Sequence, residues 1–159
     1  MENDWVISWE EIHRDATKLA YMIQLSETEY DGIIAITKGG MYSALIVSNI
    51  LGINHIDTIG IKSYSDDRMR KKAHLIKPPP VNSFRWLVID DLTDTGKTIE
   101  MVKLYMVPIS FNVATLYTKP MGNHMVNFRV KEVEQDTWIV FPWEKDHPLN
   151  EKYLREYLN

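Results

Sequence analysis

Cysteine is absent from the 159 residues of the chain. Its absence excludes a disulfide framework, a zinc site built on thiolates and a cysteine nucleophile, and it fits a reducing compartment. The sequence also lacks an apolar run of the roughly 18 residues that a membrane span needs. The acidic start, MENDWV, has none of the basic-then-apolar pattern of a signal peptide. We therefore expect a cytoplasmic protein without a transmembrane segment.

An excess of positive charge is missing as well. The chain has 18 Lys and Arg against 22 Asp and Glu, a formal net charge of −4 and a pI of about 5.7. A nucleic-acid binder usually needs a basic surface, so no nucleic-acid partner is expected. Hydrophobic residues make up 45% and charged residues 25%, which is typical of a folded globular protein. The length fits one domain over 1–159.

Hydrophobic spacing predicts strands that alternate with helices. Ser8 and Glu11 form a capping box ahead of a helix over 9–25. The other predicted elements are strands at 33–36, 55–62, 86–91 and 113–117, helices at 41–51, 98–106 and 149–158, and short extended segments at 128–133 and 138–141. Strand, helix and strand repeated twice predict an α/β fold with a mainly parallel central sheet flanked by helices. Ligands of such folds bind beyond the carboxyl ends of the strands.

The segment VIDDLTDTGKT, residues 88–98, carries the clearest chemistry. Asp90 and Asp91 end an apolar strand, where paired carboxylates can hold ribose hydroxyls and a hard cation such as Mg²⁺. The backbone amides of 95–98 can wrap a phosphate at the positive end of the next helix. Gly96 allows the backbone to bend and approach that ligand closely. The string therefore predicts a site for a phosphorylated ribose.

Asp94 lies one turn beyond the paired carboxylates and could take a proton from a bound base. The plain alternative is a solvated strand end followed by ordinary helix-capping residues, which the whole string after an apolar strand makes the weaker interpretation. The Gly-Lys-Thr triplet at 96–98 also suggests a P-loop. That motif needs a glycine where Asp91 stands, so a P-loop is not expected.

This string resembles the PRPP-binding motif of the type I phosphoribosyltransferases, in which two acidic residues close a strand ahead of D-T-G-x-T. DGIIAITKGG, HIDTIGIKSY, TLYTKPMG and QDTWIVFPW resemble, in order and spacing, the bacterial xanthine-guanine branch of that family, over most of 5–143. The resemblance implies the type I phosphoribosyltransferase fold, with a mobile loop at about 63–84 and a small hood at about 119–159. By composition alone, 63–84 is a long loop or a short hairpin.

The same resemblance implies a purine salvage enzyme. Such an enzyme transfers the 5-phosphoribosyl group from PRPP to a 6-oxopurine (guanine, xanthine or hypoxanthine) and releases the nucleoside 5′-monophosphate and pyrophosphate. It uses Mg²⁺ as cofactor and is commonly a dimer or tetramer, so we expect a homo-oligomer. Two alternatives stay open: a regulatory protein on the same fold that binds PRPP or a nucleotide, and an enzyme for another base such as a pyrimidine.

Residue by residue, the resemblance assigns PRPP to three segments. Lys38 and Gly39 match the loop that grips pyrophosphate, although bacterial relatives carry Arg where Lys38 stands. Ser63 and Tyr64 begin the mobile loop, in which Arg70 aligns with a PRPP-contacting Arg. The implied PRPP and phosphate ligands are Lys38, Gly39, Arg70, Asp90, Asp91, Asp94, Thr95, Gly96, Lys97 and Thr98, with Asp91 as the Mg²⁺ ligand. Without the resemblance, Lys38 and the basic loop could be solvated charges.

Purine binding is assigned to a second set of residues. Asp94 matches the general base near purine N7, and Lys119 matches the lysine that binds the 6-oxo group. Trp138 matches the ring that stacks on the purine, and Ile139 matches the residue whose backbone reads its edge. From the sequence alone, Lys119 could instead be an exposed lysine before a proline turn, and Trp138 could be a core residue.

Overall fold

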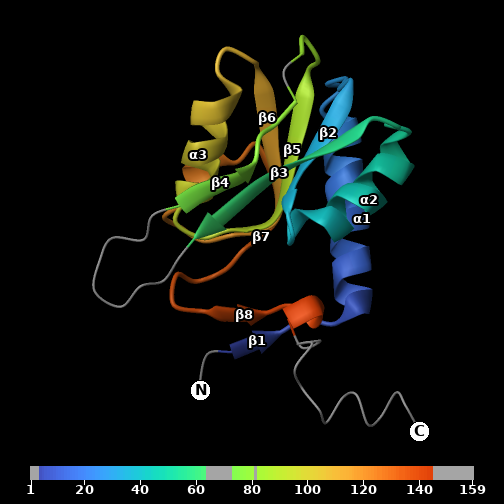
Figure 1. Cartoon of the computed structure of the whole chain (residues 1–159). Helices are drawn as coiled ribbons and strands as arrows, with labels where there is room; N and C mark the ends of the chain where they lie inside the picture. The colour runs from blue at the N-terminus through green and yellow to red at the C-terminus, as the bar shows by residue number, and fades with distance from the viewer. Residues whose placement is uncertain (1–3, 64–72, 81, 145–159) are drawn as a thin grey trace, which may run out of the picture.

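The structure, a computed structural model, describes residues 4–63, 73–80 and 82–144. Its main sheet has six strands in the spatial order β4-β3-β2-β5-β6-β7 (Figure 1). They are β2 (Gly32–Thr37), β3 (Ile56–Ser63), β4 (Ala73–Lys77), β5 (Trp86–Thr93), β6 (Phe111–Thr118) and β7 (Phe128–Glu132). Neighbouring strands are parallel except for β3 and β4, which are antiparallel. The predicted mainly parallel sheet is confirmed, with one antiparallel strand at its edge.

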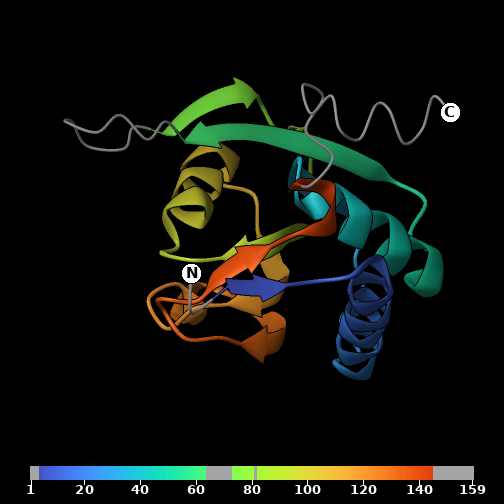
Figure 2. The same cartoon turned by 90° about the horizontal axis from the view of Figure 1, so that it is seen from below.

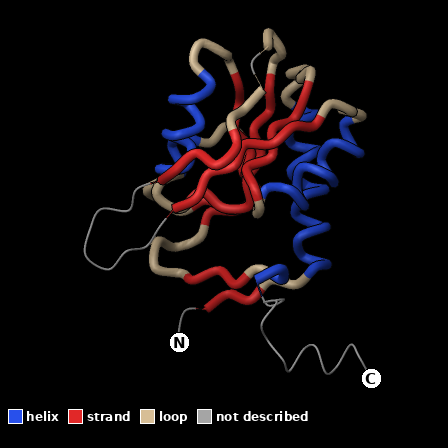
Figure 3. Tube along the Cα trace, viewed as in Figure 1, coloured by secondary structure: helices blue, strands red, loops and turns tan. Residues whose placement is uncertain are grey.

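Helices cover both faces of this sheet. The helices α1 (Trp9–Leu25) and α2 (Gly40–Leu51) lie on one side, and α3 (Lys97–Met106) lies on the other (Figures 1 and 3). The units β2-α2-β3 and β5-α3-β6 are the two predicted strand-helix-strand units. Their predicted ends differ from the observed ends by only one or two residues.

The central strand β5 is buried on both faces, because its side chains alternate between two separate cores. Leu87 and Ile89 belong to the core that contains α1 and α2. Val88 belongs to the core that contains Ile99 and Val102 of α3. A strand buried on both faces has a continuous apolar run, which is why WLVI was recognisable in the sequence. The two cores hold the carboxyl end of β5 in a fixed place.

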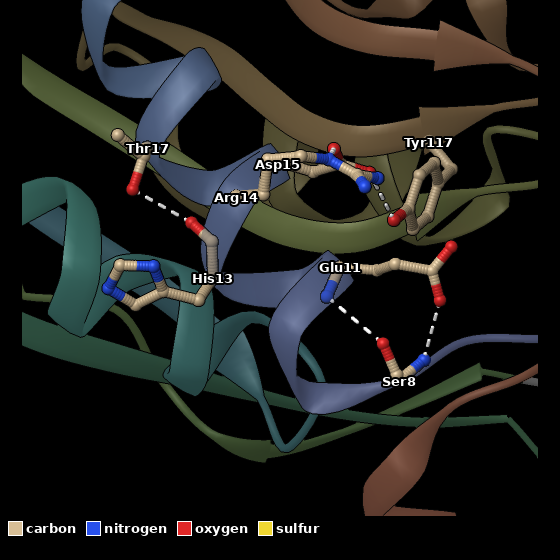
Figure 4. A network of polar contacts seen from close by, with 7 residues as sticks. All are labelled: Ser8, Glu11, His13, Arg14, Asp15, Thr17 and Tyr117. Carbon is tan, nitrogen blue, oxygen red and sulfur yellow. Dashed lines mark hydrogen bonds and ion pairs between the residues drawn. The ribbon is translucent and has the colours of Figure 1, made fainter.

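The predicted capping box at the start of α1 is confirmed. The Ser8 side chain accepts a hydrogen bond from the Glu11 N–H at 3.2 Å, and the Glu11 carboxylate accepts one from the Ser8 N–H at 2.8 Å (Figure 4). The pair satisfies two amides that a helix start otherwise leaves without partners. The helix α2 ends at Leu51, as predicted, and its C-cap Gly52 has a left-handed φ of 69°.

A second sheet has two parallel strands, β1 (Asp4–Val6) and β8 (Trp138–Val140). Figures 1 and 2 show them side by side and away from the main sheet. Two short 3₁₀ helices complete the described chain, η1 (Asn123–Met125) and η2 (Pro142–Glu144). The small sheet lies in the region where the resemblance implies a hood, but its N-terminal strand was not predicted. A strand of three residues is too short to show a periodic pattern.

The stretch 63–84, predicted as a long loop or a short hairpin, contains a strand that pairs with β3, as a hairpin requires. The strand β4 pairs antiparallel with β3, and Pro78 follows its end directly. The residues between these strands, 64–72, lie outside the described residues, as does the predicted helix at 149–158. No helix within the described ranges is long and apolar enough to cross a membrane.

Candidate active site

The carboxyl end of β5 carries two adjacent acidic residues. Asp90 is only 7% exposed, and Asp91 is partly buried. The Asp90 carboxylate accepts a hydrogen bond from the Asp91 N–H at 3.0 Å, and the Asp91 carboxylate accepts one from the Leu92 N–H at 2.7 Å. Backbone amides thus orient both carboxylates but bring no full positive charge to them.

Burial makes the charged forms of this acidic pair costly. It raises the pKa of Asp91 from the ordinary value of 3.8 to about 6, although hydrogen bonds from the neighbouring amides oppose the rise. Burial raises the pKa of Asp90 as well, and the adjacent Asp91 charge raises it further. Two carboxylates in this condition favour a cation, because a cation removes the repulsion that burial amplifies.

The end of β2 approaches this acidic pair through Gly39. A Cβ atom at Gly39 would overlap the Asp91 carboxylate, and one at Gly40 would overlap the Ile89 carbonyl oxygen. Only glycine therefore allows the backbone after Lys38 to pass so close to β5. The peptide bond between Thr37 and Lys38 is cis, and the Lys38 side chain is exposed. The structure thus brings the predicted loop at 38–39 beside the predicted carboxylates.

The turn after β5 leads directly into α3. Gly96 is the N-cap of α3, with a left-handed φ of 83°, and a Cβ there would overlap the sulfur of Met125. A glycine cap has no side chain to occupy the first amides of the helix, so these amides remain open to an anion. Thr95 and Lys97 are exposed, and Thr98 is half-buried. The start of α3 is therefore open to an anion, as the predicted phosphate site requires.

Asp94 contacts two side chains from later parts of the chain. Its Oδ2 lies 3.4 Å from the Lys119 Nζ, and its Oδ1 accepts a 2.6 Å hydrogen bond from the Gln135 Nε2. Lys119 follows β6 and is 6% exposed, so the alternative prediction of an exposed lysine before a proline turn is wrong. Its own N–H donates to the Thr93 carbonyl at 3.0 Å, which ties it to the turn of Asp94.

The strand β6 is anchored to α1 two residues before Lys119. The buried Tyr117 hydroxyl donates to Asp15 at 2.7 Å, and the Arg14 Nε donates to the other oxygen of that carboxylate at 3.0 Å (Figure 4). Burial and the Asp15 charge raise the pKa of Tyr117 far above its ordinary value, so it remains a hydrogen-bond donor at neutral pH. This network holds the end of β6 against α1 and so restrains the position of Lys119, which follows β6.

The strand β8 presents one ring outward and one side chain inward. Trp138 is 65% exposed, which rules out a core role, whereas Ile139 is 5% exposed. Ile139 lies opposite Trp5 of β1. The Trp5 ring packs edge-on against Tyr117 at 5.0 Å, with the Lys131 ammonium 4.0 Å from its centre. The strand β8, which carries Trp138, therefore pairs with β1, and β1 in turn packs against β6 through Trp5.

Not every predicted site residue can be followed in the structure. Tyr64 and Arg70 lie outside the described residues, and only the backbone of Ser63, the last residue of β3, is described. Two residues of the site were missed from the sequence, Gln135 and Trp5. Gln135 opens the QDTWIVFPW segment that was singled out, but its contact with Asp94 spans 41 residues of chain.

The chain is similar to known proteins over most of its length. Residues 8–148 match the family model described as phosphoribosyl transferase domain. The chain is 45% identical to the xanthine-guanine phosphoribosyltransferase of Desulfotalea psychrophila over 140 residues, which cover 88% of this chain and 86% of that protein. It is 38% identical to the enzyme of the same name from Cereibacter sphaeroides, over 90% of this chain and 88% of the other.

Solved structures show the same fold. The purine phosphoribosyltransferase of Pyrococcus horikoshii superposes with a TM-score of 0.76 at 28% identity, covering 89% of this chain and 94% of that one. The xanthine-guanine-hypoxanthine phosphoribosyltransferase of Helicobacter pylori has a TM-score of 0.76 at 19% identity, covering 96% of this chain and 99% of the other. At that identity the second comparison speaks for the fold alone.

Proposed function

Since the chain belongs to the phosphoribosyltransferase family, we propose that it transfers the 5-phosphoribosyl group from PRPP to guanine, xanthine or hypoxanthine in purine salvage. The proposal rests most on one observation. The acidic pair, the glycine-capped start of α3 and the Asp94–Lys119 pair lie at the ends of the adjacent strands β5 and β6, and the 38–39 loop after β2 lies beside the acidic pair. Relatives named for xanthine and guanine support the choice of base.

On the PRPP side, the 5′-phosphate would bind to the amides and hydroxyls of 94–98 at the start of α3. Oxyanions are stabilised there by backbone N–H groups and the helix dipole. Asp90 and Asp91 would accept hydrogen bonds from the ribose hydroxyls. Lys38 and Gly39, beside Asp91, would bind the pyrophosphate. A lysine supplies charge without the two-pronged geometry of arginine, so it would hold pyrophosphate as a point charge.

Members of this family generally use Mg²⁺ with PRPP. The residues present fit that ion, because the acidic pair offers hard oxygen ligands whose described hydrogen bonds come from backbone amides and not from cations. Asp91, with Asp90 beside it, would hold the metal. When bound, Mg²⁺ would balance the negative charge of the departing pyrophosphate.

On the base side, Trp138 would stack on the purine and the backbone of Ile139 would read its edge. The Lys119 ammonium is a pure donor, so it would bind a 6-oxo group and reject the amino group of adenine. In the reaction, purine N9 bonds to C1 of the ribose as the C1–O bond breaks and its electron pair leaves with pyrophosphate. Asp94 would accept the proton from N7.

The direct test offers PRPP and Mg²⁺ with guanine, xanthine, hypoxanthine, adenine or uracil in separate assays. We expect nucleotide from the three 6-oxopurines and little from adenine or uracil. Turnover of uracil instead would overturn the base assignment. PRPP binding without turnover of any base would favour the regulatory alternative, which the relatives' names do not support. A homo-oligomer and a cytoplasmic location remain predictions.

A further inference from the structure

Gln135 lies between β7 and β8 and bonds to two separate parts of the site. Its Nε2 donates to the Asp94 Oδ1 at 2.6 Å, and its Oε1 accepts from the Met121 N–H at 3.0 Å. Met121 follows Lys119 by two residues, in the turn after β6. One partly buried side chain thus links the turn of Asp94, the turn of Lys119 and the segment that leads to Trp138.

The chemistry of the two partners determines which way the Gln135 amide faces. A backbone N–H can only donate, so the amide oxygen must face Met121. The amide nitrogen then faces Asp94, and it donates to an ionised carboxylate, which is the stronger kind of hydrogen bond. A donor in this place fixes the position of the Asp94 Oδ1 atom.

Both oxygens of the Asp94 carboxylate are engaged, one by Gln135 and the other by the Lys119 ammonium. Contacts on both oxygens fix the plane of the carboxylate. In the proposed complex, the Lys119 ammonium must donate both to Asp94 and to the 6-oxo group of the purine. The Gln135 Nε2 has no role in binding the purine, so its contact with Asp94 can stay the same when the purine binds.

We propose that Gln135 is a positioning residue for the proton transfer, which holds the Asp94 carboxylate in the plane set by the Lys119 contact. This inference rests on the proposed function. Gln135 acts through Asp94 and is not itself a catalytic residue. Through Met121 it also keeps the turn of Lys119 in register with Asp94.

Two substitutions separate this role from a purely structural one. Gln135→Glu keeps the shape and can still accept from the Met121 N–H, but it replaces the donor to Asp94 with a repelling oxygen. Gln135→Ala removes both contacts. If Gln135 only supported the turn at Met121, Gln135→Glu would behave like the parent and Gln135→Ala would be impaired.

The measurement is the single-turnover rate of nucleotide formation from PRPP, Mg²⁺ and guanine, with the KM of each substrate and urea unfolding of each variant. We expect both variants to lower that rate by at least about 10-fold, which is part of the roughly 10²–10⁴-fold that a positioned general base contributes. The KM for PRPP and the unfolding midpoint of Gln135→Glu should stay near those of the parent. Gln24→Glu, an exposed position on α1, is the matched control.

A Gln135→Glu rate within about twofold of the parent would overturn the inference while leaving the proposed function intact. A strong loss of stability in Gln135→Glu would also overturn it, because Gln135 would then be a stability residue. Absence of turnover in the parent enzyme would be the failure of the proposed function, and the inference would fall with it.

Discussion

Asp94 combines exposure with fixed orientation, which suits a group that must meet a substrate proton and then give it up. Its side chain is 48% exposed although both oxygens have partners. We expect Asp94→Asn to lower the single-turnover rate by about 10²–10⁴-fold, because an amide cannot take the proton. The KM for PRPP should change little. Asp136→Asn, an exposed neighbour of the same chemistry, is the control; normal rates in Asp94→Asn would contradict the general-base role.

Lys119 is a buried cation, and its only charge partner among the described residues is Asp94. Lys119→Met keeps the length of the side chain but removes its donors. We expect kcat/KM for guanine to fall by about 10–100-fold, because the 6-oxo group loses its donor. The ratio of kcat/KM for guanine to that for adenine should fall as well. Lys18→Met on the exposed face of α1 should leave both ratios unchanged. An unaltered preference would show that another group reads position 6.

At this scale the sequence was informative where a residue belongs to a dense local motif. Asp90, Asp91 and Asp94 stand within five positions at the end of an apolar strand, so the sequence predicted a site there. Gln135 was not, because a neutral amide has many roles and its partner lies far away in the chain. The exposure of Trp138 and the burial of Lys119 were also undecided, since both depend on how β8 and β6 end in space.

The start of α3 depends on a glycine in a conformation that other residues avoid. Gly96→Ala would place a Cβ at a φ of 83° and against the sulfur of Met125. We expect a loss of about 1–2 kcal/mol in the free energy of unfolding and at least a 10-fold rise in the KM for PRPP. The amides that we propose to bind the phosphate cannot keep their arrangement when the turn shifts. Urea unfolding and PRPP titration measure the two effects.

The same fold supplies the control for that experiment. Gly52 also has a left-handed φ, at 69°, but an added Cβ would meet nothing within 4 Å. Gly52→Ala should therefore cost a similar conformational free energy without changing the KM for PRPP. If the two variants raised that KM equally, the effect of Gly96→Ala would come from general instability and not from the phosphate loop.

Elements with many apolar residues were predicted almost to their ends, whereas β1 was not. The strand β5 has a run of buried residues between two cores, and α1 has a capping box and a repeating apolar stripe. The strand β1 has three residues and is ordered by pairing with β8, which lies near the other end of the chain. A pairing of that kind depends on tertiary contacts, which a short stretch of sequence does not reveal.

For the whole molecule, the buried acidic pair connects function to stability. The folded-state pKa of Asp91, about 6, lies above its ordinary value of 3.8. The folded chain therefore binds this proton more tightly than the unfolded chain does. The corresponding contribution to stability is present below about pH 4 and is lost as the pH rises through about 6. At neutral pH, without a bound cation, the pair lowers the stability of the fold.

We therefore expect Asp91→Asn to be more stable than the parent at pH 7.5 by about 2 kcal/mol, since the amide keeps the bond from the Leu92 N–H but carries no charge. The difference should shrink as the pH falls to 5. Added Mg²⁺ should stabilise the parent more than the variant. Urea unfolding at each pH, with and without Mg²⁺, measures the stability difference, its pH dependence and the effect of the ion. A difference that stayed constant across the pH range would contradict the raised pKa of Asp91.

The pairing of β1 with β8 has a consequence for how the protein is made. During synthesis β1 leaves the ribosome before the six strands of the main sheet, and β8 emerges only after them. Contacts between such distant segments form late, because a long stretch of chain must be closed first. We expect a nascent chain to complete the acidic pair and the start of α3 while Trp138 still has no strand beside it. The strand that we propose to carry the purine-stacking ring would then reach its final place after the acidic pair and the start of α3.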